Sequence, residues 1–451
     1  MTVLSAIFWG VVVLSLLVML HEGGHFLIAR ACGMRVTEYY LGMPCKLHMA
    51  YKSKKYGTEF GVTPILLGGY TRICGMETLG DENLAQVLAC VQRSGTTNAS
   101  RIAAELSLDV DDVIDDLLAL SDCASIHALG DGGKGKEALE TYETCRRDVH
   151  MLTEYDRGHN FAAQGTTEAG VARPVDDPAD FLRSEQSHTY TGKGFWRRFF
   201  TLVAGAAVNI VLAFLIVVAV VMSVGYETIV DSNVLGGVQQ GSLAEEAGIQ
   251  AGDALVQVDG VACSNWTDIT AAVEQALDKA QPFEVAYQRD GQTYDTMIEL
   301  PEDGSATAIG VLASTMTSYP DLLEASQMAV SYGWLVAKAA VELIMPQHTI
   351  EILNQSTSVV GISVMASEAA SSGIENLLLF VAAISMSLGF MNLLPIPPLD
   401  GGKILIEVVQ AITRRPLSPK AQIAISYVGL AFFVFIFLYA LQHDIVNFVL
   451  D

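Results

Sequence analysis

The sequence HEGGH, His21–His25, follows directly on the apolar run Val3–Leu20. On a helix, His21 and His25 lie one turn apart on the same face, so their imidazole nitrogens can bind one metal ion. Glu22 stands beside them, placed to accept a proton from an attacking water. Such short patterns also arise by chance, but ionisable residues are costly inside an apolar segment of membrane length and are functional there by default. The motif therefore predicts a zinc site.

The composition predicts a polytopic α-helical membrane protein. Hydrophobic residues make up 51% of the 451 residues and charged residues only 17%. About 20 apolar residues in a helix cross a hydrocarbon core of about 30 Å. On this criterion we expect about four transmembrane helices, within residues 1–35, 199–222, 377–403 and 421–441. The first should not be a cleaved signal peptide, because no basic residue precedes it and HEGGH follows directly on its end.

The basic residues predict the orientation of these helices. They collect after the first span, before the second, and between the third and fourth, whereas the stretch between the second and third has only Lys279, Arg289 and Lys338. Because cytoplasmic loops carry the excess of Lys and Arg, we expect residues 82–190 in the cytoplasm and both termini outside. The seven cysteines form no C-x-x-C pair. All but Cys263 fall on the predicted cytoplasmic side, where thiols stay reduced, so we expect no disulfide framework.

Residues 36–75 predict a membrane-associated β-hairpin or sheet. They contain short runs of strand-forming residues separated by glycine turns. An open edge of this sheet could bind an extended substrate through backbone hydrogen bonds. Alternatively, the sheet only covers the site, and the sequence leaves both roles open.

Residues 82–129 predict a small helical insertion that resembles a winged helix-turn-helix. Apolar residues recur at helical spacing in three stretches, and Thr97 or Asn98, and later Asp109, are suited to cap helices. The expected recognition helix carries DVDDVIDD, residues 109–116, in a chain of net charge −24. This charge argues against nucleic acid as a partner and leaves a protein-contact or regulatory role and plain packing open. The polar residues 130–190 predict a linker that is partly disordered.

Residues 227–311 predict a soluble domain between the second and third spans. The pattern contains a short helix, a strand ending at Asp259-Gly260, a second helix at Trp266–Leu277, and paired strands joined at Asp290-Gly291. This order resembles a circularly permuted bacterial PDZ domain, which either binds a chain end by strand addition or acts as a steric plug. Residues 322–345 are apolar but hold charged residues, which predicts an interfacial amphipathic helix.

Two further polar residues belong to the apolar spans. Asn209 lies among small residues of the second span, where it either bonds between helices or polarises a substrate carbonyl. Asp400 follows the proline-broken end of the third span in NLLPIPPLDG, residues 392–401. Asp400 is either a turn former before Gly401 or the carboxylate that completes a zinc site with two histidines and an open fourth position. Because Asp400 and HEGGH are expected at the same membrane depth, we favour the role of Asp400 as a zinc ligand.

Together these motifs resemble the site-2 protease family of intramembrane zinc metalloproteases, in its bacterial branch with a single PDZ domain. The resemblance rests on HEGGH, LGGY at 67–70, the asparagine of span two, the PDZ-like domain and N-x-x-P-x-P-x-L-D-G. It covers nearly the whole chain outside residues 82–170. It implies a bound Zn²⁺ with His21, His25 and Asp400 as ligands, Glu22 as catalytic acid/base, and Asn209 and Asn392 as helpers. Gly68, Gly69 and Tyr70 become candidate substrate-binding residues.

The resemblance also implies a function and a location. The expected activity is hydrolysis of peptide bonds within or near transmembrane segments of membrane-anchored substrates, such as anti-sigma factors or signal-peptide remnants. The expected location is the bacterial inner membrane, with the PDZ-like domain extracytoplasmic. Expected partners are the lipid bilayer, single-span membrane proteins and an upstream protease, with no nucleic acid.

Two alternatives and three departures accompany this resemblance, and one of the departures is the cytoplasmic insertion, which is not part of the family core. A catalytically silent PDZ-bearing scaffold would not need four ionisable groups in apolar spans. A metal-ion transporter would need further polar residues in the third and fourth spans. Ala206 stands where the family usually has proline, and Ser-Val-Val-Gly, residues 358–361, replaces a loop that usually contains Gly-Pro.

Overall fold

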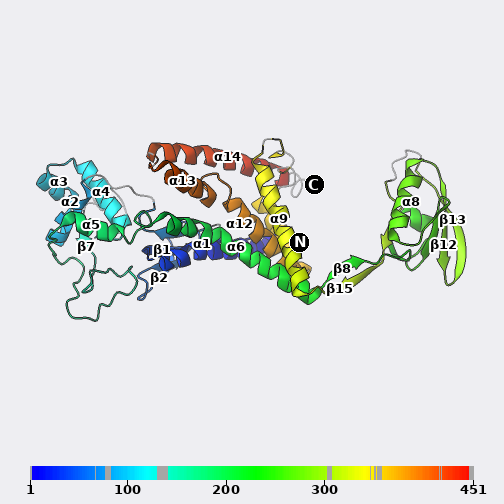
Figure 1. Cartoon of the computed structure of the whole chain (residues 1–451), viewed down its shortest axis with the longest axis horizontal. Coiled ribbons are helices and arrows are strands. Elements are labelled where there is room, and N and C mark those ends of the chain that lie inside the picture. Colours follow the sequence, from blue (N-terminus) through cyan, green and yellow to red (C-terminus); the bar gives the residue numbers. More distant parts are fainter. Residues whose placement is uncertain are drawn as a thin grey trace. The chain divides into compact units, whose positions relative to one another are not determined.

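The computed structural model divides into two compact units (Figure 1). The first, which we call the membrane unit, combines Met1–Val217 with Met328–Asp451, and the second, the inserted module, is Val218–Gln327. The described residues are 3–66, 68–76, 83–129, 141–301, 307–345, 347–349, 352, 358–415, 417 and 419–445. Glu82, Leu67 of the LGGY motif and the 130–140 part of the predicted linker therefore lie outside the described residues.

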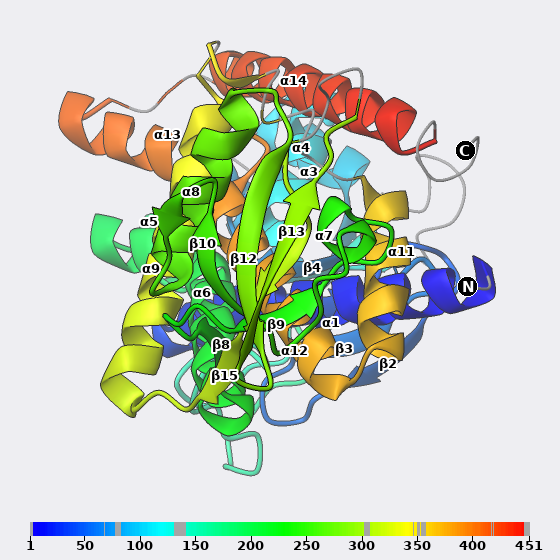
Figure 2. The same ribbon diagram turned by 90° about the vertical axis from the view of Figure 1, so that its right-hand side faces the viewer.

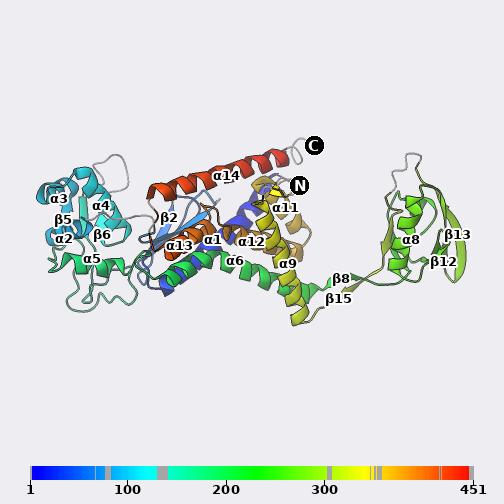
Figure 3. The ribbon, with the colours of Figure 1, turned by 45° about the horizontal axis from the view of Figure 1, so that its top comes forward.

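Four helices among the described residues are long and apolar enough to cross a membrane. They are α1 (Val3–Ala31), α6 (Phe195–Val224), α12 (Ile374–Asn392) and the stretch Ala421–Gln442 of α14 (Pro419–Ile445). Figures 1 and 3 show α1 and α6 side by side. These helices confirm the four predicted apolar segments and make the chain a multi-pass membrane protein.

The third spanning helix ends earlier than predicted, and the L-D-G sequence opens a helix of its own. α12 ends at Asn392, and α13 runs over Asp400–Thr413. Pro395, Pro397 and Pro398 lie between the two helices, where missing N–H groups and fixed φ angles prevent a helix from continuing. Asp400 is therefore the first residue of α13, and not the end of a single helix over 377–403.

A further helix, α11 (Val359–Ser371), was not predicted. The hydroxyl of Ser358 caps it by accepting from the N–H of Val360 at 3.2 Å, so residues 358–361 are a helix start and not a loop. α11 packs closely on α1, because a Cβ added to Gly10 would lie 2.1 Å from Oγ of Ser363. Its 13 residues are too few to cross a bilayer, so a search for spans passes over it.

Residues 36–75 form the predicted β region as a four-stranded sheet beside α1. Its strands are β1 (Val36–Leu41), β2 (Met49–Lys52), β3 (Glu59–Val62) and β4 (Gly69–Ile73), in the order β2-β3-β1-β4. β1 runs parallel to β3 and antiparallel to β4. The ring of Phe26 on α1 contacts the rings of Tyr39 and Phe60 edge to face. Edge strand β2 exposes Met49 and Tyr51 by 83% and 67%, an apolar surface that suits a membrane-associated sheet.

The segment after this sheet folds into a helical insertion (Figure 3). Its elements are α2 (Leu84–Ser94), β5 (Thr96–Asn98), α3 (Ala99–Leu106), α4 (Val110–Asp122), β6 (Ile126–Ala128), β7 (Thr141–Thr144) and α5 (Pro178–Gln186). The strands form an antiparallel sheet in the order β5-β7-β6. As predicted, Asn98 and Asp109 cap α3 and α4. Their side-chain oxygens accept from the N–H groups of Arg101 and Asp111 at 2.9 and 2.8 Å.

The predicted linker is wrong over residues 141–190. β7 and α5 belong to the insertion, and Tyr142, Phe181 and Leu182 pack into the same apolar core as α2, α3 and α4. A low density of apolar residues predicted disorder here. A count of apolar residues does not reveal that charged residues can also be buried when they form ion pairs.

Four buried charged residues join the insertion to the base of α1. Arg35 donates to both carboxylate oxygens of Asp156 at 2.7 Å and to Glu185 at 2.8 Å. Arg147 donates to both oxygens of Glu185 at 2.7 and 2.9 Å. None of the four is more than 3% exposed. Burial opposes ionisation of both carboxyl groups, but the arginines outweigh it, together with His188 at Asp156, and lower the pKa of Asp156 and of Glu185.

The inserted module contains one long helix packed on a four-stranded sheet (Figure 2). Its elements are β8 (Tyr226–Ile229), β9 (Leu235–Val238), α7 (Leu243–Glu246), β10 (Ala254–Val258), β11 (Val261–Ala262), α8 (Trp266–Asp278), β12 (Phe283–Arg289), β13 (Gln292–Ile298), β14 (Val311–Ala313) and β15 (Thr315–Ser318). The sheet has the order β11-β10-β12-β13, and β14 pairs with β9 and β15 with β8. α9 (Leu322–Leu343) follows; it occupies the stretch predicted as an interfacial helix.

The turns of the inserted module confirm the predicted hairpin positions. Asp259 and Gly260 have φ values of 47° and 82°, and Asp290 and Gly291 have 51° and 79°. Two successive residues with positive φ form the turn that matches the twist of paired strands, and Asp-Gly is well suited to it.

We predict that Arg35→Met destabilises the helical insertion, because it leaves the carboxylates of Asp156 and Glu185 buried without one of their cations. Breaking a buried ion pair costs about 3–5 kcal/mol. Hydrogen exchange of the amides of α5 should therefore speed up in the purified variant. Arg183→Met is the matched control, since Arg183 and its partner Asp180 are 72% and 65% exposed. Equal exchange in the two variants would contradict a stabilising role for the buried cluster.

Candidate functional site

Three candidate metal ligands from two helices meet in the membrane unit. His21 and His25 lie on α1, and Asp400 is the first residue of α13. Nε2 of His21 lies 3.2 Å from Nε2 of His25, and Oδ2 of Asp400 lies 3.1 Å from each of these nitrogens. Both histidines are 7% exposed. The fold thus brings HEGGH and L-D-G together, as predicted, across 379 positions of the chain.

The geometry of this cluster fits a zinc ion. Ligand atoms that lie about 2.0–2.2 Å from one tetrahedral ion are roughly 3.3 Å apart, close to the observed separations. Two imidazoles and one carboxylate form a donor set that catalytic zinc uses, with a fourth position left open. Gly205 of α6 keeps space beside the cluster. A Cβ there would lie 2.4 Å from Nε2 of His25 and 2.8 Å from Nε2 of His21.

A main-chain carbonyl fixes the orientation of His25. Its Nδ1 lies 2.7 Å from the oxygen of Thr201 on α6. A carbonyl only accepts, so Nδ1 carries the proton and donates it, which leaves the lone pair of Nε2 free for a metal. Nδ1 of His21 is buried and has no hydrogen-bond partner among the described residues. α6 therefore orients one of the two imidazoles directly.

The two glycines of HEGGH have different surroundings. A Cβ on Gly24 would lie 2.5 Å from the carbonyl oxygen of Ala204 and 3.0 Å from Cα of Gly205, whereas a Cβ on Gly23 would meet only the hydroxyl of Tyr39, at 3.5 Å. α1 and α6 therefore touch backbone to backbone at Gly24. The small residues of the second span were the sequence signal for this contact, but its partner on α1 was not predicted.

The first residue of β4 approaches the predicted acid/base. Thr71 Oγ1 donates to the main-chain oxygen of Glu22 at 3.1 Å, and a Cβ on Gly69 would lie 3.5 Å from Cγ of Glu22. Glu22 is half-buried, and no hydrogen bond or ion pair of the described residues engages its carboxylate. Such a carboxylate is available to exchange protons with a substrate or water.

The two predicted asparagines differ in their surroundings. Asn209 lies on α6, one turn after Gly205, and is fully buried. Neither its amide nitrogen nor its amide oxygen has a partner among the described residues, although its main-chain oxygen accepts from Oγ of Ser385 at 2.8 Å. Asn392 ends α12 and is half-buried. No contact in the described part of the chain connects its side chain with the histidines.

Of the predicted substrate-binding glycines and tyrosine, only Gly69 lies against Glu22. The main-chain oxygen of Gly68 accepts from the N–H of Gly42 at 2.7 Å. The hydroxyl of Tyr70 donates to Glu38 at 2.8 Å, and its ring stacks on that of Tyr40 with centroids 5.3 Å apart. Gly68 and the Tyr70 side chain are thus engaged within the sheet region.

A residue that the sequence analysis missed holds α13 in place. Glu407 is 7% exposed and lies two turns after Asp400 on α13. It accepts from the hydroxyl of Tyr190 at 3.1 Å, and Nη2 of Arg198 on α6 lies 3.1 Å from its other oxygen. These contacts connect the helix that carries Asp400 with α6 and with the end of the helical insertion.

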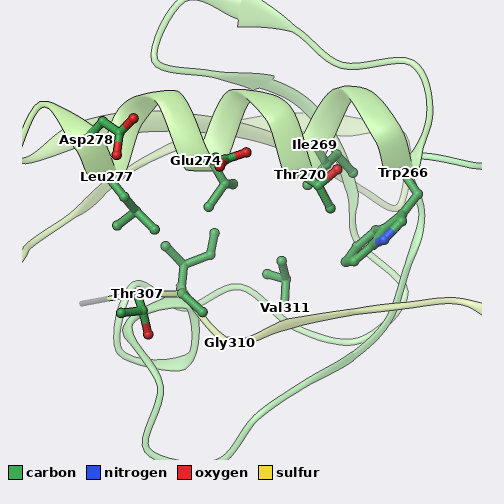
Figure 4. A pocket seen from close by; sticks show the side chains of 12 residues that line it. Trp266, Ile269, Thr270, Glu274, Leu277, Asp278, Thr307, Gly310 and Val311 are labelled. Carbon is green, nitrogen blue, oxygen red and sulfur yellow. The ribbon is translucent and has the colours of Figure 1, made fainter. Parts of the chain in front are cut away.

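The inserted module has a separate groove, drawn in Figure 4. A cavity of about 700 Å³ lies between α8 and the segment Thr307–Val311. Leu277 and Thr307 lie toward one end and Trp266 toward the other. Glu274 and Asp278 also belong to its lining. Val311 begins β14, which pairs with β9 alone among the described strands, so a strand edge borders this groove.

We predict that Gly24→Ala weakens zinc binding by about 10–100-fold, the cost typical of disturbing the groups that orient metal ligands. The added methyl group would push α1 away from Ala204 and Gly205, and so move both imidazoles relative to α6. Gly23→Ala is the matched control, because its methyl group meets only an ordinary contact. Zinc affinity of the two purified variants checks this, and equal affinities would contradict the close approach of α1 and α6.

Comparison with known proteins agrees with this site. Residues 9–436 match the model of peptidase family M50. The chain is 28% identical over 445 residues to a putative zinc metalloprotease of Streptococcus pyogenes serotype M6, covering 97% of this chain and 98% of the relative. It is 26% identical to the regulator of sigma-W protease RasP of Bacillus subtilis (96% and 97% covered) and 25% identical to the probable protease Eep of Enterococcus faecalis (97% and 98% covered). The chain belongs to peptidase family M50, the site-2 protease family of intramembrane zinc metalloproteases.

Proposed function

We propose that His21, His25 and Asp400 hold the zinc of this protease and that Glu22 is its catalytic acid/base. The meeting of two imidazoles and one carboxylate within 3.2 Å, on helices far apart in the sequence, supports this assignment. The reaction is hydrolysis of peptide bonds within or near transmembrane segments. A silent scaffold would not need buried ionisable groups converging in a membrane protein.

The chain's own residues divide the chemistry between them. Bound zinc polarises the scissile carbonyl and lowers the pKa of water to about 7. Glu22 accepts the proton of the attacking water and passes it to the leaving amine. No hydrogen bond or ion pair of the described residues competes for its carboxylate. Asn209 offers an amide N–H to the carbonyl oxygen on which negative charge develops. Its amide, which has no partner among the described residues, supports this role over one in hydrogen bonding between helices. No contact in the described part of the chain supports a role for Asn392.

Strand β4 is the proposed surface for the substrate backbone. A transmembrane helix engages its carbonyls in hydrogen bonds between residues i and i−4, so the segment to be cut must first be extended. β4 is an edge strand of its sheet, and Gly69 places its start against Glu22. An extended segment added to this edge would bring a peptide bond toward the acid/base. This supports substrate presentation over mere covering of the site.

The proposed substrates are single-span, membrane-anchored proteins. The name of the Bacillus subtilis relative, regulator of sigma-W protease, supports membrane-anchored anti-sigma factors, and signal-peptide remnants present the same chemistry. A substrate with a bulky outer domain would first need trimming by an upstream protease. Only then could its remaining segment enter a site enclosed by helices.

We assign the inserted module to the PDZ fold and the helical insertion to a winged-helix-like fold. A groove between a helix and a strand edge suits an extended peptide, and Glu274 and Asp278 favour a segment with basic residues over a terminal carboxylate. In the insertion, the order helix, strand, helix, helix, strand, strand is that of a winged helix. The exposed Asp111, Asp112 and Asp115 on α4 support a protein partner or a regulatory role over nucleic acid.

We predict that Glu22→Gln retains one zinc per chain and lowers cleavage of a single-span substrate by about 10²–10⁴-fold, the usual contribution of general acid–base catalysis. Glutamine keeps the shape of the side chain but cannot accept the proton. His25→Ala, by contrast, should lose both zinc and cleavage. Zinc content and cleavage measured on the same purified samples check this, and near wild-type cleavage by Glu22→Gln would refute the mechanism.

The proposed topology places the inserted module outside the cell membrane and the helical insertion in the cytoplasm. The module has only two basic residues, Lys279 and Arg289, among many acidic ones, and basic residues stay on the cytoplasmic side. The native thiols of these two parts are poor reporters of sidedness. Cys90, Cys145 and Cys263 are at most 5% exposed, and burial raises the pKa of Cys123 to about 12.

We predict that Thr293→Cys on β13 reacts with a membrane-impermeant thiol reagent in intact cells, whereas Asp112→Cys on α4 reacts only after permeabilisation. Both positions are exposed, so the difference reports sidedness and not burial. Labelling of Asp112→Cys alone in intact cells would reverse the proposed topology.

A further inference from the structure

A second cavity in the membrane unit lies at the end of α1, and the protease mechanism does not use it. Its volume is about 550 Å³, and three segments line it. α1 contributes Leu27, Arg30 and Ala31, the loop before β3 contributes residues 54–56, and the loop after Asp156 contributes residues 157–159. The cavity therefore borders a membrane-spanning helix, the sheet region and the helical insertion at once.

The lining of this cavity is strongly basic. Arg30, Lys54, Lys55, Arg157 and His159 contribute to it, and no acidic residue of the described part of the chain does. The net charge of the whole chain, by contrast, is −24. Lys54, Lys55 and Arg157 are exposed and form no ion pair among the described residues. Arg30 and Lys55 each lie over the ring of Tyr56, at 5.4 and 5.3 Å from its centroid. This many uncompensated cations around one hollow favours an anionic ligand.

The walls of the cavity are held by main-chain contacts. Arg30 is only 9% exposed, and its Nη1 donates to the carbonyl oxygen of Tyr155. His159 Nδ1 donates to the carbonyl oxygen of Asp156 at 2.8 Å, and Asp156 is itself bound by Arg35. A Cβ on Gly57 would lie 2.5 Å from the carbonyl oxygen of Glu154, so the two loops meet backbone to backbone. The cations are thus carried on segments that are fixed against one another.

An apolar side chain adjoins this basic lining. Leu27 is 62% exposed and lies one turn before Arg30 on α1, a helix that is long and apolar enough to cross the membrane. Leu27 and Tyr56 both line the cavity. Tyrosine is enriched at membrane–water interfaces. A ligand that fits must therefore carry negative charge at one end and hydrocarbon at the other. Free phosphate carries no hydrocarbon and therefore fits this lining less well than a charged lipid.

We infer that this cavity binds the headgroup of an anionic phospholipid. Arg30, Lys54 and Arg157 surround the phosphate, and Leu27 contacts the start of an acyl chain. Basic pockets at the cytoplasmic ends of transmembrane helices take anionic headgroups in this way. The bound lipid contacts α1 at Leu27 and Arg30, two and five residues after His25, and it bridges α1 to the sheet region and to the helical insertion.

Binding of phosphatidylglycerol to the full-length protein in neutral detergent, followed by native mass spectrometry, tests this inference. Lys54→Gln/Arg157→Gln should weaken the first binding event about tenfold or more, since each basic residue near an anionic lipid contributes on the order of a few-fold in affinity. Lys46→Gln/Arg101→Gln is the matched control. It removes two exposed cations that do not line the cavity and should bind like the wild type. Lys54→Arg/Arg157→Lys should also retain binding, which separates charge from folding.

Three further ligands complete the test. Phosphatidylcholine should not compete with phosphatidylglycerol, and inorganic phosphate should compete only weakly. Full competition by inorganic phosphate would make this a phosphate site and overturn the lipid assignment. If Lys54→Gln/Arg157→Gln weakened binding of a short oligonucleotide more than binding of the lipid, the cavity would be a nucleic-acid site instead. Equal lipid binding by the test and control variants would refute the site. Because every readout is binding, failure here leaves the proposed protease activity untouched.

Discussion

Three ligand atoms from two helices lie within 3.2 Å of one another in the membrane unit, and much of the surrounding structure exists to permit this. Polar groups are costly inside a membrane protein unless they have partners. Gly24 and Gly205 let α1 and α6 approach until no Cβ fits between them. The carbonyl of Thr201 then orients His25, and the proline-rich turn before Asp400 allows α13 to start at the histidines.

A second set of buried polar contacts links this site to the rest of the membrane unit. Glu407 fixes α13 through Tyr190 and Arg198. Arg35, four residues after the end of α1, binds Asp156 and Glu185 of the helical insertion. The insertion is thus anchored at Asp156, Glu185 and Tyr190 next to the helices that carry the candidate ligands. An effect of a partner or of a bound lipid on the insertion therefore has a short route to the site.

The parts of this structure that depend on local pattern were predictable from the sequence. Each of these features can be recognised from a short stretch of sequence: HEGGH, L-D-G, the apolar spans, the caps Asn98 and Asp109, and the Asp-Gly turns. The missed features depend on partners distant in the chain. Residues 141–190 were predicted as part of a partly disordered linker because they are polar and show little periodicity. In the structure, the opposite charges of Arg147 and Glu185 pair in the interior. α11 was missed because 13 residues are too short for a span. Tyr70 was predicted as a candidate substrate-binding residue, but the sequence did not show that its hydroxyl donates to Glu38 within the sheet.

The central claim is that zinc is held by two imidazoles and one carboxylate. X-ray absorption at the zinc edge of the purified protein tests it most directly. We expect only nitrogen and oxygen neighbours at about 2.0–2.2 Å, with the outer-shell pattern of two imidazoles, and we expect His25→Ala to retain no zinc at this site. The chain also has seven cysteines. A sulfur shell at about 2.3 Å, or a spectrum unchanged in His25→Ala, would place the metal elsewhere and contradict the account.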